Sequence, residues 1–305
     1  MKPEMRASLA CVIVWLLFAA ANASAQVRGV YPLGMSATNS GVTPEPGFSY
    51  VNQFLIYTRD ELKGPTGEVQ AAGRQSVVMD MNSLVWVSRK EILGAKFSMS
   101  ATFPLANNSL TSDLNGEISG GGGFADSYYQ PFILGWETNR VAIRTIYGFL
   151  APTGRFDPDA NNNVGSGYWT HVVASGQTLY LTASKATAFS AFQMYEFHTT
   201  QEGTDIHPGQ TFNLDYSLTH TFPLGGNLRM QAGLVGYSQY QTTDKTGPTI
   251  TAEQGKAHYR VSSLGFTSSV ILSQKVNVGF KYFSELSGRS TFQGYSAQIS
   301  GSIRF

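Results

Sequence analysis

The chain ends on the stretch Tyr295-Ser296-Ala297-Gln298-Ile299-Ser300-Gly301-Ser302-Ile303-Arg304-Phe305. Counted back from the end in steps of two, one set of positions is mostly apolar and the other is wholly polar. Successive side chains of a β-strand point to opposite faces of the sheet, so this stretch predicts a strand with one apolar and one polar face. A strand that spans a bilayer needs about 9–11 such residues, whereas strands of soluble proteins average roughly 5–6. The final strand therefore favours a membrane-spanning sheet.

The composition of the whole chain agrees with such a sheet. Only 13% of the 305 residues are charged, compared with about 25% in soluble domains. Hydrophobic residues make up 42% and the mean hydropathy is −0.12. These values exclude several membrane helices, because each would need roughly 20 consecutive apolar residues. The aromatic content of 12% and the small net charge also exclude a disordered chain.

The N-terminus has the features of a secretory signal peptide over residues 1–25. Lys2 and Arg6 are followed by an apolar run from residue 9 to residue 21 and by the cleavage motif Ala23-Ser24-Ala25. The apolar run is too short to span a bilayer, so a retained membrane helix is the less favoured alternative. We therefore expect an exported chain.

Removal of this signal peptide would change the charge balance. It takes two of the 21 basic and one of the 20 acidic residues, which leaves 19 of each and no net charge. No basic surface for a nucleic acid is then expected. The single cysteine, Cys11, would leave as well, so no disulfide is expected.

Alternation of polar and apolar residues recurs along the chain and predicts an all-β fold. We expect twelve strands, at residues 48–61, 76–89, 92–105, 127–137, 140–151, 176–183, 186–199, 209–222, 227–241, 257–272, 274–285 and 291–305. Short connections between them alternate with longer ones at 62–75, 106–126, 152–175, 200–208 and 242–256, if a shorter one at 286–290 is placed among the outer loops. Bacterial outer-membrane barrels have an even number of strands, short periplasmic turns and longer extracellular loops. Residues 48–305 are therefore expected to form a transmembrane antiparallel β-barrel of about 12 strands, with both termini on the periplasmic side.

Strand parity predicts which side chains face lipid and which face the lumen. A charge on the lipid face costs about 2–4 kcal/mol at the bilayer midplane, so we place charged residues inside. The alternation breaks between Val261 and Leu264, which indicates either a β-bulge or a misplaced boundary. The parity of strands 48–61 and 186–199 is ambiguous. The lumen-lining candidates for transport are Asp80, Lys96, Arg144, Glu196, Asp215, Arg229, Lys281 and Glu285. Equally, these charges could form an internal network without a transport role.

Residues 26–47 precede the first expected strand and are too rich in glycine and proline to span the membrane. An apolar cluster formed by Val30, Tyr31, Leu33 and Met35 lies among the turn residues. We expect a periplasmic N-terminal segment that either folds into the periplasmic mouth as a small plug or remains a loose tail.

An ordered set of motifs resembles a known protein family. The motifs are Gly29-Val30-Tyr31-Pro32-Leu33-Gly34, Pro44-Glu45-Pro46-Gly47, Phe124-Ala125-Asp126, Leu134-Gly135-Trp136, Tyr147-Gly148-Phe149-Leu150-Ala151-Pro152-Thr153-Gly154, Gly167-Tyr168-Trp169-Thr170, Tyr195-Glu196-Phe197 and Gly236-Tyr237. Together they resemble the proteobacterial outer-membrane family named for the MetA pathway of phenol degradation. The resemblance implies an outer-membrane channel associated with the breakdown of aromatic compounds and with uptake of hydrophobic substrates. It carries over no binding residue.

The final strand resembles the C-terminal signature of bacterial outer-membrane barrels. That resemblance implies recognition of Phe305 by the barrel-assembly machinery. The cell outer membrane of a Gram-negative bacterium is therefore the expected location, with outer-membrane lipid as a partner.

The leading hypothesis for function is a passive porin-like channel for small hydrophobic or aromatic compounds, not an enzyme, with no cofactor, metal or catalytic residue. One alternative is a barrel-embedded, phospholipase-like hydrolase, which needs a His beside a nucleophilic Ser or an acid pair. His198 follows Glu196 on one parity, but no serine motif accompanies any histidine. A structural barrel is the third hypothesis. Substrate identity, lateral opening and oligomeric state stay open.

Overall fold

The described chain is a sheet of 13 strands that closes on itself. A computed structural model describes residues 28–112, 116–160 and 162–305, and the expected signal peptide lies outside them. The strands are β1 (Gly47–Lys63), β2 (Val69–Ile92), β3 (Ala95–Ser112), β4 (Gly116–Phe124), β5 (Ser127–Glu137), β6 (Val141–Ala151), β7 (Thr170–Tyr180), β8 (Thr187–His198), β9 (Thr211–Gly225), β10 (Leu228–Gln241), β11 (Arg260–Ile271), β12 (Val276–Arg289) and β13 (Thr291–Arg304). One short helix, α2 (Ala252–Lys256), precedes β11. Among the described residues, no helix is long and apolar enough to cross a membrane.

The barrel closes because β1 pairs with β2 on one side and with β13 on the other, both antiparallel. The second half of β3, residues 105–112, pairs with β4, whereas residues 96–102 pair with β5. Therefore β4 and β5 share one position in the wall, and the barrel has twelve wall positions. The expected twelve-stranded antiparallel barrel is confirmed.

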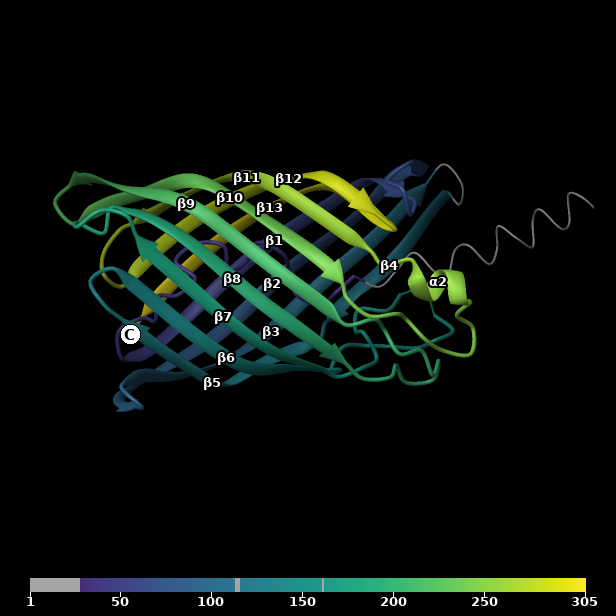
Figure 1. Cartoon of the computed structure of the whole chain (residues 1–305), viewed down its shortest axis with the longest axis horizontal. Coiled ribbons are helices and arrows are strands. Elements are labelled where there is room, and N and C mark those ends of the chain that lie inside the picture. Colours follow the sequence, from purple (N-terminus) through teal and green to yellow (C-terminus); the bar gives the residue numbers. More distant parts are fainter. Residues whose placement is uncertain (1–27, 113–115, 161) are drawn as a thin grey trace, which may run out of the picture.

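All the long connections lie at one end of the barrel, the end that carries α2 (Figure 1). We call the end with the short turns and the C-terminus the turn end, and the end with α2 the loop end. Leu93 and Gly94 join β2 to β3 at the turn end, and both have positive φ, 53° and 70°, as tight hairpins of the favoured hand require. The loop end carries the long connections 152–169, 199–210 and 242–259. The placement of these long connections is the one expected of extracellular loops.

Several expected boundaries are wrong. The connections expected at 62–75 and 286–290 shorten to residues 64–68 and to Ser290, because β1, β2 and β12 extend into them. The seventh strand begins at Thr170 rather than at residue 176, because its outward positions there include His171 and Ser175, which blur the apolar–polar period. Residues 106–126 are not a loop, since β3 continues through them and β4 pairs back onto it. Gly120 to Gly123 lie within β4, which hid this strand from a pattern based on apolar residues.

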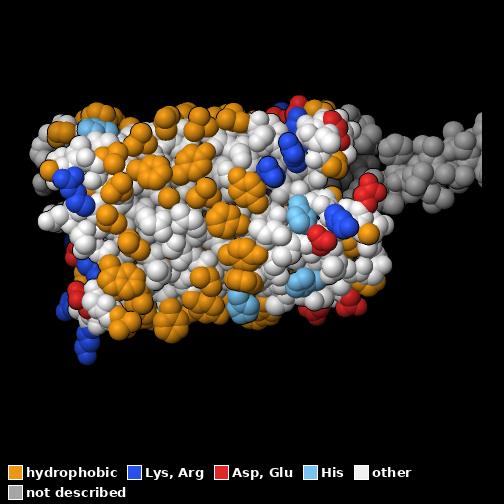
Figure 2. Space-filling view, viewed as in Figure 1, with side chains coloured by type: hydrophobic (Ala, Val, Ile, Leu, Met, Phe, Trp, Pro, Cys, Tyr) orange, Lys and Arg blue, Asp and Glu red, His pale blue; other side chains and the backbone are white. Residues whose placement is uncertain are grey.

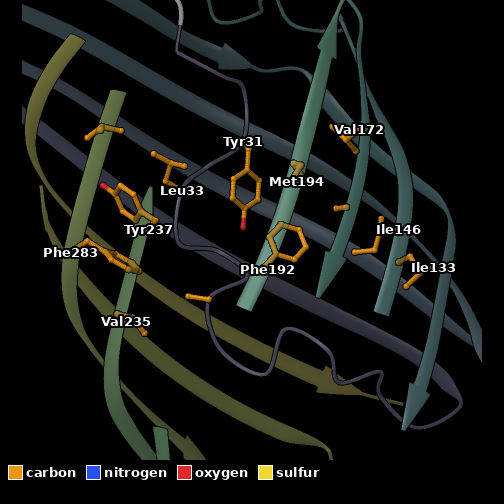
Figure 3. Packing of buried hydrophobic residues seen from close by; sticks show 13 residues of the cluster. Tyr31, Leu33, Ile133, Ile146, Val172, Phe192, Met194, Val235, Tyr237 and Phe283 are labelled. Atoms are coloured by element: carbon orange, nitrogen blue, oxygen red, sulfur yellow. The ribbon is translucent and has the colours of Figure 1, made fainter. Parts of the chain in front are cut away.

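Alternation across the wall separates an apolar outside from a polar inside. On β9, Thr211, Asn213, Asp215 and Ser217 are buried inward, whereas Leu218 is 46% exposed. Hydrophobic side chains cover the middle of the outer surface, and the charged side chains gather towards its two ends (Figure 2). The register of β11 against β12 shifts between Ser262 and Ser263, where Leu286 of β12 is the extra residue. The alternation of β11 itself is unbroken, because Val261 is buried inside and Leu264 is exposed outside. The buried core lies inside the barrel, between the wall and residues 28–46 (Figure 3).

Candidate functional site: a partly filled lumen

Residues 28–46, here called the lumen segment, run through the barrel from one end to the other. Arg28 forms an ion pair with Glu285 at the loop end, with 2.8 Å between Nη1 and Oε1. Glu45 pairs with Lys96 at the turn end, at 2.9 Å. The sequence left open whether this segment plugs the periplasmic mouth or remains a loose periplasmic tail. Because Arg28 is at the loop end, the described chain does not begin on the side expected for the N-terminus. The described residues of the segment lie inside the lumen, because buried side chains on the wall bind its backbone along the way.

Glu196 on β8 binds the start of the lumen segment. Its carboxylate accepts hydrogen bonds from the backbone N–H groups of Val30, at 2.9 Å, and Tyr31, at 3.1 Å. The side-chain amide of Asn213 donates a third bond at 2.7 Å. Glu196 is fully buried, so these donors compensate the loss of water around its carboxylate.

Asp215 on β9 binds the next turn of the segment. Tyr31 donates its hydroxyl to Oδ2 at 2.6 Å, and the backbone N–H groups of Gly34 and Ser36 donate at 3.0 and 3.2 Å. The carboxylates of Glu196 and Asp215 thus accept hydrogen bonds from backbone N–H groups of the lumen segment that are not paired with a β-strand. A glycine- and proline-rich segment can occupy the lumen without leaving these N–H groups unpaired.

Cations and amides bind the carbonyl groups of the same turn. Lys281 on β12 donates from Nζ to the carbonyl oxygens of Gly34, at 3.0 Å, and Met35, at 2.6 Å. Gln298 on β13 donates to the carbonyl oxygen of Leu33 at 2.7 Å. Five of the expected lumen charges, Lys96, Glu196, Asp215, Lys281 and Glu285, therefore contact the lumen segment.

The apolar cluster of the lumen segment packs against the inner wall. Tyr31, Leu33 and Ala37 belong to one buried cluster with residues of β5 to β12, and Tyr31 lies close to Phe192 and Met194 (Figure 3). The ring centroids of Tyr31 and Phe192 are 5.7 Å apart. Gly34 has a φ of +81°, and a Cβ atom there would collide with the ring of Phe283. The turn at Gly34 therefore requires glycine for two reasons, the positive φ and the lack of room for a side chain.

A cavity of about 1010 Å³ remains beside the lumen segment. It reaches from loop-end residues such as Phe156 and Ile250 to Arg144 and Gln130 within the barrel. Its walls include the side chains of Met35, Met79, Met81, Met194, Tyr31, Tyr128 and Phe192. Methionine side chains are flexible and polarisable, so such a wall adapts to apolar ligands of different shape.

Four charged side chains contribute to the wall of this cavity: Arg28, Asp126, Arg144 and Lys245. Asp126 accepts hydrogen bonds from the backbone N–H groups of Gly154, at 3.0 Å, and Ser166, at 2.7 Å. Lys245 lies in the connection between β10 and β11, where burial lowers the pKa of its amine.

The other lumen-lining candidates lie away from the cavity. Lys96 is at the turn-end rim with Glu45, and Arg229 is exposed at the turn end of β10. The prediction that Asp80 faces the lumen is wrong. Met79 and Met81 take the inward positions of β2 and line the cavity, so Asp80 between them is on the outer face.

Neighbouring amides compensate the outward carboxylate of Asp80. Asn52 donates to Oδ1 at 2.6 Å and Asn82 donates to Oδ2 at 3.2 Å. The sequence could not show this, because β2 carries apolar residues on both faces. The same ambiguity hid Met79 and Met81, which parity would have identified once the register of β2 was known.

The structure brings together His198 and Glu196, the pair considered for the hydrolase hypothesis, inside the barrel. His198 is 4% exposed, and its ring contacts the hydroxyls of Thr170, at 2.9 Å, and Thr211, at 3.4 Å. Its Nε2 also lies 3.4 Å from Oε2 of Glu196, and the same carboxylate accepts the hydrogen bonds from Val30 and Tyr31. Within residues 28–112, 116–160 and 162–305, no group of three His, Cys, Asp or Glu side chains could hold a metal ion.

A closed antiparallel barrel with an apolar outer belt, a polar inner face and segregated short and long connections is an outer-membrane-type barrel. The chain belongs to the family of the MetA-pathway of phenol degradation, whose sequence profile matches residues 58–300. The family resemblance carried by the ordered motifs is thereby confirmed.

Two solved structures have a similar fold. An outer membrane channel from Pseudomonas putida F1 superposes with a TM-score of 0.73 and 12% identity, over 88% of this chain and 98% of that chain. The β domain of a Bordetella autotransporter superposes with a TM-score of 0.51 and 12% identity, over 86% of this chain and 100% of that chain. At such identities the similarity shows the fold. A search of curated proteins found no match to the chain.

Proposed function

We propose that this protein is a passive channel of the outer membrane that takes up small hydrophobic or aromatic compounds. The observation that carries the proposal is the cavity of about 1010 Å³, lined by methionine and aromatic side chains, that extends from the loop end into the lumen. Membership of a family named for phenol degradation supports it. So does the shared fold with a protein described as an outer membrane channel.

The lumen segment gives this channel its selectivity. It fills the side of the barrel next to β8 to β13 with hydrogen-bonded backbone and an apolar cluster. The remaining path runs along β1 to β6, where the cavity lies. A path of this kind admits compact apolar solutes and needs no cofactor, because solutes follow their concentration gradient.

The test is transport across an asymmetric bilayer with a lipopolysaccharide outer leaflet, since neutral aromatic compounds cross plain phospholipid unaided. Purified protein should raise the flux of benzyl alcohol and of a short alkane several-fold above the protein-free membrane, and the flux of a disaccharide little. Fluxes equal to those of the protein-free membrane for every apolar probe would refute the proposal.

A further inference from the structure

Arg144 differs from the other buried cations of the lumen. It is on the inward face of β6 between Ala142 and Ile146, both buried, and it lines the cavity. Its Nε is buried and has no hydrogen-bond partner, and within the described residues its guanidinium has no ion pair. By contrast, Arg28 forms an ion pair with Glu285, and Lys281 donates to two carbonyl oxygens.

The lumen segment passes close to this guanidinium on both neighbouring strands, so the open space beside Arg144 is the cavity itself. The neighbours of Arg144 across the sheet are Gly135 on β5 and Gly176 on β7, neither of which has a side chain. Thr43 of the lumen segment lies over Gly135, where an added Cβ would collide with its hydroxyl. The Thr43 hydroxyl is also buried without a partner. The carbonyl group of Ser40 covers Gly176 in the same way. The lumen segment therefore closes both sides of Arg144 along the wall, and the guanidinium is accessible from the cavity.

An unpaired buried charge is costly, so a ligand that pairs with it gains affinity. A water molecule could bond to Nε, but it would not neutralise the guanidinium. The planar donor fork of arginine matches a carboxylate, which can accept two parallel hydrogen bonds. The chemistry of the position therefore selects an anionic oxygen pair.

Apolar side chains surround the space next to Arg144. Phe192 is the strand neighbour of Gly176 on the side away from Arg144, and Ile146 and Met194 line the same cavity. Asp126, the acidic side chain of the cavity wall, accepts two backbone hydrogen bonds, so it does not compete for the guanidinium. An anionic group at Arg144 would thus have an apolar body lying against phenylalanine, isoleucine and methionine.

We propose that Arg144 is the binding site for the carboxylate of a small aromatic acid, whose ring lies against Phe192, Ile146 and Met194. The site rests on the proposed channel function, and it adds aromatic carboxylates to the neutral compounds that the cavity admits. Arg144 slows the passing acid by binding it in the part of the lumen towards the turn end. Neutral compounds of the same size pass without this contact.

Equilibrium binding to the detergent-solubilised full-length barrel tests the site, with benzoate as the probe and benzyl alcohol as its neutral counterpart. Benzoate should bind the wild type more tightly than benzyl alcohol does. Arg144→Gln should weaken benzoate binding about tenfold or more, because a hydrogen bond to a charged group is lost, and leave benzyl alcohol unaffected. Arg229→Gln, a change at an exposed arginine of the turn end, should bind benzoate like the wild type.

Equal affinity of the wild type for benzoate and benzyl alcohol would overturn the inference without any variant, and so would an unchanged benzoate affinity in Arg144→Gln. Arg144→Lys, which keeps the charge but not the fork, should bind benzoate with intermediate affinity. The failure of the channel itself is seen separately, as benzyl alcohol flux through the wild type equal to that of the protein-free membrane.

Discussion

Single side chains decide how the lumen is filled. Asp215 alone accepts hydrogen bonds from Tyr31, Gly34 and Ser36, and the turn it binds depends on Gly34. At that position both the backbone conformation and the nearby Phe283 ring exclude a side chain. One residue without a side chain thus fixes the path of the segment past the wall.

Gly34→Ala should loosen the lumen segment. The left-handed conformation costs an L-residue about 1–2 kcal/mol, and the collision with Phe283 adds to this. We expect backbone amides of residues 30–37 to exchange with solvent at least about tenfold faster in hydrogen-exchange measurements. Gly301→Ala is the control, because an added Cβ there meets no atom within 4 Å. Unchanged exchange in Gly34→Ala would contradict the account of this turn.

At the scale of elements, the lumen segment needs the barrel wall for its conformation, whereas the wall closes without the lumen segment. The wall closes through β1 paired with β2 and β13, and none of these ladders includes the lumen segment. The segment, by contrast, depends on the wall for Glu196, Asp215 and Lys281. Its removal should therefore leave a barrel with a wider, water-filled lumen.

Deletion of residues 28–45 should raise single-channel conductance several-fold in planar bilayers and admit a disaccharide in flux assays. The freed carboxylates and Lys281 would then contact water, so the barrel itself should remain folded. A folded barrel is recognised by a change in its gel mobility on heating, and the variant should show the same change as the wild type. An unchanged conductance with a folded barrel would show that the segment does not limit the path.

At the scale of the whole molecule, the outer surface is matched to a bilayer. Leu234 lies near the middle of β10 and is 56% exposed on the apolar belt, and Leu93 is 84% exposed in a turn. Asp80 is an exception within the belt, compensated by Asn52 and Asn82. Burial in lipid therefore explains exposed leucines that water would disfavour.

Leu234→Arg should destabilise the membrane-inserted barrel by about 2–4 kcal/mol, because an arginine at the midplane loses its hydration. Leu93→Arg should cost about 0–1 kcal/mol, as expected near an interface. Denaturant-induced unfolding from lipid vesicles measures both. Equal costs would mean that Leu234 does not lie in the hydrocarbon layer.

The sequence by itself determined the barrel. The alternation in Tyr295 to Phe305, repeated along the chain, and the ordering of short and long connections are local patterns, because each strand must present one face to each solvent. The sequence of β2 does not show which of its faces points inward, because both faces carry apolar residues. The strand register in the structure places Met79 and Met81 inside and Asp80 outside. Only the tertiary structure decided the contents of the lumen. Glu196 binds Val30 across a separation of 166 residues, whereas Arg144 faces a cavity. The sequence cannot distinguish these two cases, because the partner of an inward charge is brought to it by the fold from a distant part of the chain.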